Sequence, residues 1–346
     1  MPKFSFVIPV YNNKQYLEAC VQSVLSQTVQ DHEVLLIDDG STDGSKELCD
    51  LLEKRDVRIR SFHKENGGPS SARNMGIDHS AGQYVLFVDG DDTIEPDCLQ
   101  KIEPFLEGES CLPVFGMCFD YWNGDRLVKT EVCSVSCPGE HTVSEVAAEL
   151  PKFFNDNVLS SACNKVFPVK LLRDNDLRFP EDMTLYEDLA FVLRCLPHFE
   201  RIHVVDSGLY HYRNDMSKKH LDRRVADYEA MRKNLVPLNN ILHEFGELTG
   251  QRRQCATVLA NLNIMLLEQH MLSCKSSGQE LKDKLAGFVS ESRFEEALSC
   301  GAELDPGKQK LTDNIKRGRI TWIRCEYAVK RWKKKLRTIA KRILHR

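Results

Sequence analysis

The chain has 346 residues, 42% hydrophobic and 28% charged, which is typical of a soluble globular protein with room for two or three domains. Its thirteen cysteines include no Cys-x-x-Cys pair, which argues against a zinc or dithiol redox centre and fits a reducing cytosol. No apolar run reaches about 18 residues, and the start is too short for a signal peptide, so we expect neither translocation nor a transmembrane anchor.

The net charge of −4 hides an uneven distribution. Residues 316–346 carry 13 lysines and arginines against one acid, Glu326, whereas the remainder carries 34 bases against 50 acids. The chain therefore joins an acidic body to a strongly basic tail.

The first ninety residues alternate apolar runs with amphipathic segments. Buried strands are predicted at 4–10, 33–37, 57–62 and 84–88, and helices between them, one of which carries Arg73. This alternation indicates crossover units and a parallel sheet.

Polar residues follow each of these predicted strands. Ligands bind at the carboxyl ends of strands in such sheets, so convergence of these residues on one edge is our strongest physical indication of a site. They are Tyr11 and Asn12, then Asp38 and Asp39, then Asn66, Gly67 and Arg73, and last Asp89, Asp91 and Asp92.

The turn Asp89-Gly90-Asp91-Asp92 places three carboxylates close together. Such anions repel one another unless a cation neutralises them, and oxygen ligands favour Mg²⁺ or Mn²⁺. The alternative is a solvated acidic turn that caps the next helix through Asp92 or Thr93.

Beyond Pro113 the pattern changes. A hairpin with an Asn123-Gly124 turn is predicted over 114–132, and short strands at 201–205 and 209–212. Thr184-x-x-Glu187 indicates a capping box that opens a helix. Past Lys218 the sequence turns helical, and we place a domain boundary there.

The tail repeats apolar residues every three or four positions among its bases. This is typical of a helix lying in a membrane surface. A helix docked on its own domain, a dimer seam and a nucleic-acid contact are the alternatives, the last disfavoured by the acidic body and by the lack of a nucleic-acid module. The apolar stripe is Trp322, Cys325, Val329, Trp332, Leu336, Ile339 and Ile343.

Several of these motifs together closely resemble family 2 glycosyltransferases of GT-A fold, of the bacterial type that builds capsule, exopolysaccharide and lipopolysaccharide. The resemblance runs from residue 4 to about 216. The motifs are Val7-Ile8-Pro9-Val10-Tyr11-Asn12, Leu36-Ile37-Asp38-Asp39-Gly40-Ser41-Thr42-Asp43, Asn66-Gly67-Gly68, Ala72-Arg73-Asn74-x-Gly76, Phe87-Val88-Asp89-Gly90-Asp91-Asp92, Cys163-Asn164-Lys165, Arg178-Phe179-Pro180, Tyr186-Glu187-Asp188 and Leu209-Tyr210-His211-Tyr212-Arg213.

The resemblance implies a nucleotide site in the first half. Asp39 would accept the uracil N–H, with Asp38 or Asp39 alternatively serving only as a helix cap, and Asp89 would meet the ribose. Arg73 would lie near the nucleotide or would otherwise be an ordinary surface cation. The remaining nucleotide-binding positions are Pro9 and Tyr11, which would pack against the base, and Asn12, Asn66 and Gly67.

The resemblance also implies a metal and a base. Asp91, Asp92 and His211 would approach Mn²⁺ or Mg²⁺, although His211 is as readily a satisfied strand residue. Asp188 would take the proton from the acceptor hydroxyl; Glu187 already has a structural role in the capping box, which favours Asp188. Glu187, Asn164 and Lys165 would contact the acceptor.

We therefore expect an α/β protein of GT-A fold, with a Rossmann-like, mostly parallel sheet flanked by helices, a C-terminal helical region and a basic amphipathic tail. The catalytic domain would span 1–216, its nucleotide-binding half about 1–110 and its acceptor half about 111–216. A helical domain would occupy 217–315 and a membrane-associating helix 316–346.

The expected activity is metal-dependent, inverting transfer of a sugar from a nucleotide donor, UDP-linked, to a saccharide or polyprenyl-linked saccharide. The enzyme would work at the cytoplasmic face of the membrane, without nucleic acid, and a homodimer is left open. A non-catalytic nucleotide-sugar-binding scaffold and a sugar nucleotidyltransferase are the alternatives. The latter needs a glycine-rich basic loop after the first strand, and a nicotinamide dehydrogenase needs Gly-x-Gly-x-x-Gly there; this chain has Pro-Val-Tyr-Asn-Asn.

Overall fold

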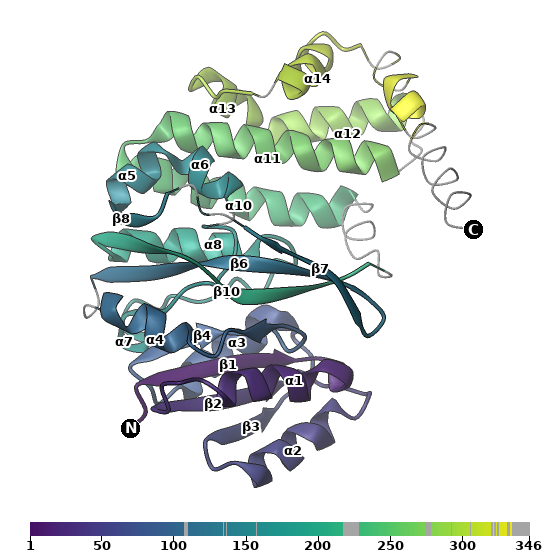
Figure 1. Ribbon diagram of the computed structural model, residues 1–346. Coiled ribbons are helices and arrows are strands. Elements are labelled where there is room, and N and C mark those ends of the chain that lie inside the picture. Colours follow the sequence, from purple (N-terminus) through teal and green to yellow (C-terminus); the bar gives the residue numbers. More distant parts are fainter. Residues whose placement is uncertain are drawn as a thin grey trace. The chain divides into compact units, whose positions relative to one another are not determined.

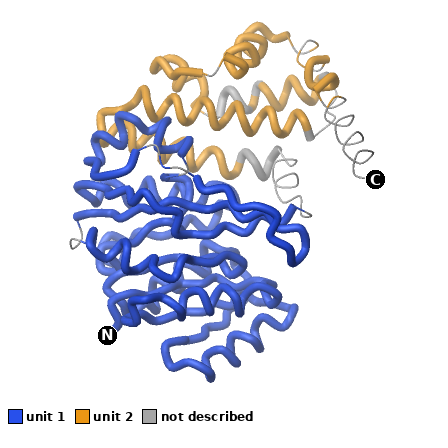
Figure 2. The backbone as a smooth tube through the Cα atoms, viewed as in Figure 1, with its two compact units in different colours: residues 1–218 blue, residues 219–346 orange. Residues whose placement is uncertain are grey.

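The computed structural model describes residues 1–106, 110–133, 135, 137–156, 158–216, 228–273, 278–291, 293–304, 306–319, 321, 323, 325–330 and 333. The chain divides into two compact units, residues 1–218 and 219–346 (Figure 2). Each unit has its own core, and we describe each by itself.

The first unit opens with the predicted parallel sheet, whose strand order is β3-β2-β1-β4-β9 (Figure 1). β1 to β4 run parallel, and β9 pairs antiparallel with β4. The strands are β1 (Phe4–Val10), β2 (His32–Asp38), β3 (Ile59–His63), β4 (Tyr84–Phe87) and β9 (Phe167–Pro168), and the intervening helices are α1 (Lys14–Leu25), α2 (Ser45–Arg55) and α3 (Gly68–His79). The predicted GT-A-like α/β architecture is confirmed.

A second sheet continues the unit in the order β5-β10-β6-β7, with β8 also pairing with β10. β5 (Thr93–Ile94) follows the acidic turn and pairs antiparallel with Tyr210 and His211, so it draws β10 beside that turn. The other members are β6 (Cys111–Asn123), β7 (Arg126–Val132), β8 (Gly139–Thr142) and β10 (Arg201–Asp215).

β10 corrects one prediction. Instead of two short strands around Asp206-Ser207-Gly208, the chain forms one strand with irregular register between Val205 and Tyr210. A Cβ on Gly208 would lie 2.6 Å from Cys118 Sγ, so this glycine permits the close approach of β6 that keeps the strand continuous.

Short helices complete the first unit. They are α4 (Cys98–Ile102), the 3₁₀ segment η1 (Glu103–Phe105), α5 (Val143–Ala148), α6 (Leu150–Asn155), α7 (Val169–Asp174), α8 (Glu187–Cys195) and the 3₁₀ segment η2 (Leu196–His198). The predicted capping box before α8 is wrong. Tyr186, with φ +61°, is the N-cap residue and Glu187 is the first helical residue, so Glu187 cannot occupy the third position that the box requires.

An aromatic cluster fills the core between β4 and α8. Phe179 stacks on Phe191 with ring centroids 3.8 Å apart, and the Phe87 ring meets Phe179 edge-on at 5.0 Å. Burial of each such side chain stabilises the fold by about 1.5–3 kcal/mol. The cluster fixes both the segment before α8 and the strand that ends in the acidic turn.

The second unit is helical. Its described helices are α10 (Tyr228–Thr249), α11 (Arg252–Ser273), α12 (Gly278–Glu291), α13 (Phe294–Ser299) and α14 (Pro306–Lys316). The buried amides of Asn239 and Asn263 hydrogen-bond each other at 3.2 and 2.9 Å, which pairs α10 with α11. None of the helices that the structure describes combines the length and apolar character needed to cross a membrane.

The packing of α3 on β1 depends on Gly76. A Cβ there would lie 2.2 Å from Val7 Cγ1, so Gly76→Ala should lower the free energy of unfolding by about 1–3 kcal/mol through overpacking. Urea unfolding of the full chain measures this loss. Adding Val7→Ala removes the colliding methyl groups, so the double variant should recover part of it, and strictly additive losses would contradict the packing argument.

Candidate active site

The acidic turn is held from three directions. The Asp89 amide donates to the Tyr210 hydroxyl at 3.1 Å, and that hydroxyl donates to Asp92 Oδ2 at 2.6 Å. The Arg213 amide donates to Asp92 Oδ1 at 2.7 Å. A Cβ on Gly90 would lie 2.7 Å from Asn13 Nδ2 and 3.1 Å from the Pro9 carbonyl oxygen, so a larger residue would displace the Asn13 side chain or the turn.

Asp92 is therefore an anchor between the two sheets. Only 2% of the residue is exposed, and burial, reinforced by Asp91 and Asp89, raises the pKa of its carboxyl well above the ordinary value. Both of its oxygens already accept hydrogen bonds from β10. Asp91 is half-buried and Asp89 keeps a third of its side chain exposed, so these two are better placed to meet a ligand than Asp92.

Arg73 joins the acidic turn to the start of α8. Its guanidinium donates to Asp89 Oδ1 at 2.7 Å and to Asp188 Oδ1 at 3.0 Å, and its Nη1 lies 3.9 Å from Glu187 Oε1. The side chain is only 4% exposed. Burial alone would lower the Arg73 pKa, but the carboxylates of Asp188 and Asp89 outweigh it and raise the pKa. The arginine is thus the buried centre of the site and not a surface cation.

Asp188 is fixed at its second oxygen by the Ala162 amide, which donates to Oδ2 at 3.0 Å. It lines a cavity of about 200 Å³ together with Asp89, Asp92 and Tyr210. Glu187 is partly buried, and burial, followed by the charge of Asp188, raises the pKa of its carboxyl. The two carboxylates occupy the first turn of α8, where the helix dipole favours negative charge.

The expected nucleotide residues gather at the carboxyl ends of β1, β2 and β3. Tyr11, two residues after Pro9, is 51% exposed, and Asn12 accepts from the Thr42 amide at 2.8 Å. Asn66 Nδ2 donates to the Asp39 carbonyl at 3.0 Å. The loops that follow the three strands are therefore cross-linked to one another.

The Asp39 carboxylate is buried and accepts three hydrogen bonds. They come from Lys64 Nζ at 2.7 Å, the Gly67 amide at 2.9 Å and the Gly68 amide at 2.7 Å. A carboxylate has about four acceptor positions, so one remains for a ligand N–H. Asp38 accepts from the Ser41 amide and faces His63; it closes the loop after β2 and does not cap α2, which begins at Ser45.

His211 does not reach the acidic turn. Its Nδ1 lies 3.0 Å from Asp120 Oδ2 and its Nε2 lies 2.8 Å from Glu95 Oε1. Both ring nitrogens are thus engaged by carboxylates outside the Asp89–Asp92 turn. The expected metal contact of His211 is therefore not found. The pairing of His211 with Thr93 on β5 places the ring beside Glu95.

Asn164 and Lys165 also differ from the expected acceptor contacts. Lys165 is fully buried, and its ammonium donates to the carbonyls of Val158 and Ser161 and to Asn164 Oδ1. Asn164 in turn donates to the Phe115 carbonyl. These side chains hold the 158–164 loop, and the Ala162 amide of that loop orients Asp188. They therefore position the site without lining it.

Sequence reasoning gave no role to Tyr210, Ala162 or Phe179. The phenol of Tyr210 anchors the turn, the Ala162 amide orients Asp188, and the Phe179 ring lies 5.3 Å from the Arg73 guanidinium. Motif matches marked Tyr210 and Phe179 as part of the resemblance. Their roles depend on contacts across more than a hundred residues of sequence, which spacing does not reveal.

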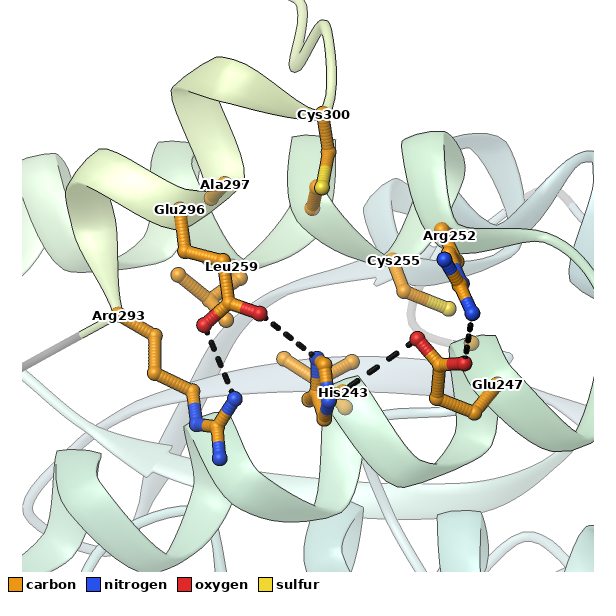
Figure 3. A pocket seen from close by; sticks show the side chains of 12 residues that line it. His243, Glu247, Arg252, Cys255, Leu259, Arg293, Glu296, Ala297 and Cys300 are labelled. Carbon is orange, nitrogen blue, oxygen red and sulfur yellow. Dashed lines mark hydrogen bonds and ion pairs between the residues drawn. The ribbon is translucent and has the colours of Figure 1, made fainter.

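A second cavity, of about 80 Å³, lies in the helical unit among α10, α11 and α13 (Figure 3). His243 sits between Glu296, at 3.4 Å, and Glu247, at 3.9 Å, and the flanking Arg293 and Arg252 pair with these glutamates. This chain of polar side chains ties the three helices together. It contains none of the residues that the sequence nominated.

The pKa of Lys165 gives a test of the buried loop. Burial lowers it from 10.5 to about 7, so above pH 7 the unfolded chain binds this proton more strongly than the folded chain does. The free energy of unfolding should therefore rise with pH relative to Lys165→Met, by at most about 1.4 kcal/mol per pH unit.

Urea unfolding between about pH 7 and pH 9 measures this difference. This range lies between the Lys165 pKa of about 7 in the folded chain and the ordinary value of 10.5 in the unfolded chain. Lys170→Met, at an exposed lysine on α7, is the matched control and should follow the wild type. Parallel curves for wild type and Lys165→Met would mean that the three oxygen acceptors keep the ammonium charged.

The chain is similar in sequence to known glycosyltransferases. Residues 5–163 match the family model for Glycosyl transferase family 2. The chain is 28% identical over 299 residues to the uncharacterized glycosyltransferase EpsJ of Bacillus subtilis, covering 86% of each protein. It is 26% identical over 292 residues to poly(ribitol-phosphate) beta-N-acetylglucosaminyltransferase TarS of Staphylococcus aureus, covering 82% of this chain and 47% of TarS.

The crystal structure of S. aureus TarS 1–349 in complex with UDP-GlcNAc superposes with a TM-score of 0.55 at 23% identity, covering 88% of this chain and 93% of that one. This likeness shows the shared fold. The family match covers residues 5–163, which include the parallel strands and the acidic turn, so this region of the chain is similar to glycosyl transferase family 2.

Proposed function

We propose that the enzyme transfers a sugar from a UDP-linked donor to a saccharide acceptor, with inversion and with a divalent metal. The observation that carries the proposal is the shared cavity of Asp89 and Asp188, bridged by the buried Arg73. A donor-side carboxylate and a candidate base thus face the same space. Such a space can bring the anomeric carbon and an acceptor hydroxyl together.

The donor end has features that suit a nucleotide. The exposed ring of Tyr11 offers a stacking face for a base, an interaction worth about 1–3 kcal/mol, and the remaining acceptor position of Asp39 suits an N–H of uracil. TarS has been crystallised with UDP and with UDP-GlcNAc, which favours a uridine donor here.

The residues of the acidic turn fit Mn²⁺ or Mg²⁺. Among the described residues no group of three or more potential ligands is arranged to hold a metal alone. Mg²⁺, however, is ordinarily bound by one or two carboxylates plus substrate phosphates, and Asp89 and Asp91 supply two. When bound, the metal would stabilise the negative charge that builds up on the departing diphosphate.

The acceptor proton is assigned to Asp188. Its Oδ1 is held by Arg73 and its Oδ2 by the Ala162 amide, which leaves one acceptor position on each oxygen for a substrate hydroxyl. Removal of the proton as that oxygen attacks would give inversion in one displacement. Arg73 orients the carboxylate for this step.

Asp188→Asn should reduce sugar transfer about 100- to 10,000-fold while UDP binding stays within about twofold, because it removes the base and leaves the donor loops intact. Transfer is measured as UDP release, and binding by thermal shift with UDP, with and without Mn²⁺. Asp182→Asn, at an exposed carboxylate upstream of α8, should behave as wild type.

Other results would identify the alternatives. Wild-type protein that binds UDP without turning over any UDP-sugar would be a nucleotide-sugar-binding scaffold. Synthesis of a UDP-sugar from UTP and a sugar 1-phosphate would identify a nucleotidyltransferase. Full activity of Asp188→Asn would place the base elsewhere.

We propose that the enzyme acts at the cytoplasmic face of the membrane on a lipid-linked saccharide, and the C-terminal segment supports this location. Ile323 and Tyr327 are buried, and the Tyr327 hydroxyl donates to Glu268 Oε1 on α11 at 2.5 Å. Cys325 and Val329, on the predicted stripe, are exposed. Trp322, Trp332, Leu336, Ile339 and Ile343 lie outside the described residues. A docked helix that leaves basic and apolar groups outward suits an anionic surface.

Removal of residues 334–346 deletes six lysines and arginines and keeps the docked Ile323 and Tyr327. The truncated enzyme should lose most co-sedimentation with phosphatidylglycerol vesicles, since each near-surface base contributes about 1 kcal/mol. Its activity on a soluble acceptor should be unchanged. Equal sedimentation of the two proteins would contradict a membrane role for this segment.

A further inference from the structure

The cavity beside Asp188 has two unlike walls. One wall is acidic and consists of Asp89, Asp92 and Asp188. The other is apolar and aromatic and comes from β6 and β10, with Met117, Phe119, Tyr210 and Tyr212. The proposed function uses only the acidic wall, so the aromatic wall needs a separate explanation.

Strand register creates the aromatic wall. Phe119 on β6 is the pairing partner of Tyr212 on β10, and the two rings meet edge-on with centroids 5.7 Å apart. Tyr210, two residues before Tyr212, is fully buried, and its hydroxyl donates a hydrogen bond to Asp92 in the acidic turn. Tyr212 by contrast is 41% exposed. The core does not require an aromatic ring at so exposed a position.

Hydroxyl groups border this wall. Ser160 and Ser161, from the loop that Lys165 holds in place, line the same cavity. No residue that lines it, within the part of the chain that the structure describes, is a lysine or arginine. The buried Arg73 behind it is already shared between Asp89 and Asp188. A phosphate group on the acceptor would meet these carboxylates at short range, because a metal held at the acidic turn would already be neutralised by the donor diphosphate.

We propose that this cavity binds the acceptor as an uncharged pyranose ring, with Tyr212 as the platform for its apolar face. A pyranose has a C–H face that packs on an aromatic ring and hydroxyls at its edge that can meet Ser160, Ser161 and Asp188. The inference rests on the proposed function and narrows it. The acceptor terminus is a neutral sugar and not a polyol phosphate.

The test pairs a turnover assay with a binding assay. UDP release is measured with UDP-glucose, UDP-galactose and UDP-GlcNAc in the presence of octyl glucoside, octyl galactoside or octyl N-acetylglucosaminide below their micellar concentrations, and with ribitol 5-phosphate or glycerol 3-phosphate. Binding of the same acceptors to the UDP-loaded enzyme is followed by saturation-transfer NMR, which needs no turnover.

At least one octyl pyranoside should bind and increase UDP release above the acceptor-free rate, and the polyol phosphates should do neither. Tyr212→Ala should raise the acceptor KM about tenfold, the effect of losing one aromatic contact, without changing the affinity for UDP. Tyr212→Phe retains the ring and should stay within about threefold of wild type. Tyr121→Ala, on β6 but outside the cavity, should match wild type.

Stronger stimulation or binding by a polyol phosphate, no binding of any pyranoside, or an unchanged acceptor KM in Tyr212→Ala would overturn the inference. A failure of the proposed function has a different signature: no UDP release from any donor under any condition. Because the NMR measurement does not depend on catalysis, it decides the inference even in that case.

Discussion

The buried guanidinium of Arg73 is the interaction on which the site depends. It lies between Asp89, at the end of β4, and Asp188, in the first turn of α8, which are 99 residues apart in the sequence. Without this cation, partly buried carboxylates would face one another across a small cavity, at a cost of several kcal/mol. The arginine therefore makes it tolerable to place the carboxylates of Asp89 and Asp188 close to each other.

A set of buried contacts supports this charge cluster. Phe179 provides an aromatic face beside the guanidinium, and Tyr210 ties the acidic turn to the second sheet. Lys165 holds the loop whose Ala162 amide fixes Asp188. Each supporting group is buried and hydrogen-bonded or packed, so the carboxylates keep one arrangement before any substrate arrives. Such preorganisation is what electrostatic catalysis requires.

The two walls of the cavity come from different secondary-structure elements. The acidic wall follows from β4 and α8, which belong to the parallel sheet and its covering helix. The aromatic wall follows from β6 and β10, whose register in the second sheet sets Phe119 beside Tyr212. In the proposed function, donor chemistry and acceptor recognition thus depend on different parts of the first unit, which meet at the Asp89–Asp92 turn.

The sequence by itself determined that the first ninety residues form a parallel sheet, where its strands lie along the chain and which polar residues follow them. Apolar periodicity and turn residues are local signals, so these features could be predicted. It also placed Asp188 beside Glu187 at a helix start. Only the tertiary structure decided that Asp92 and Lys165 are internal anchors, that His211 faces Glu95 and Asp120, and that Arg73 is buried. The role of a side chain in the site depends on which distant group contacts it and on how far it is buried from water. Residue spacing in the sequence predicts neither.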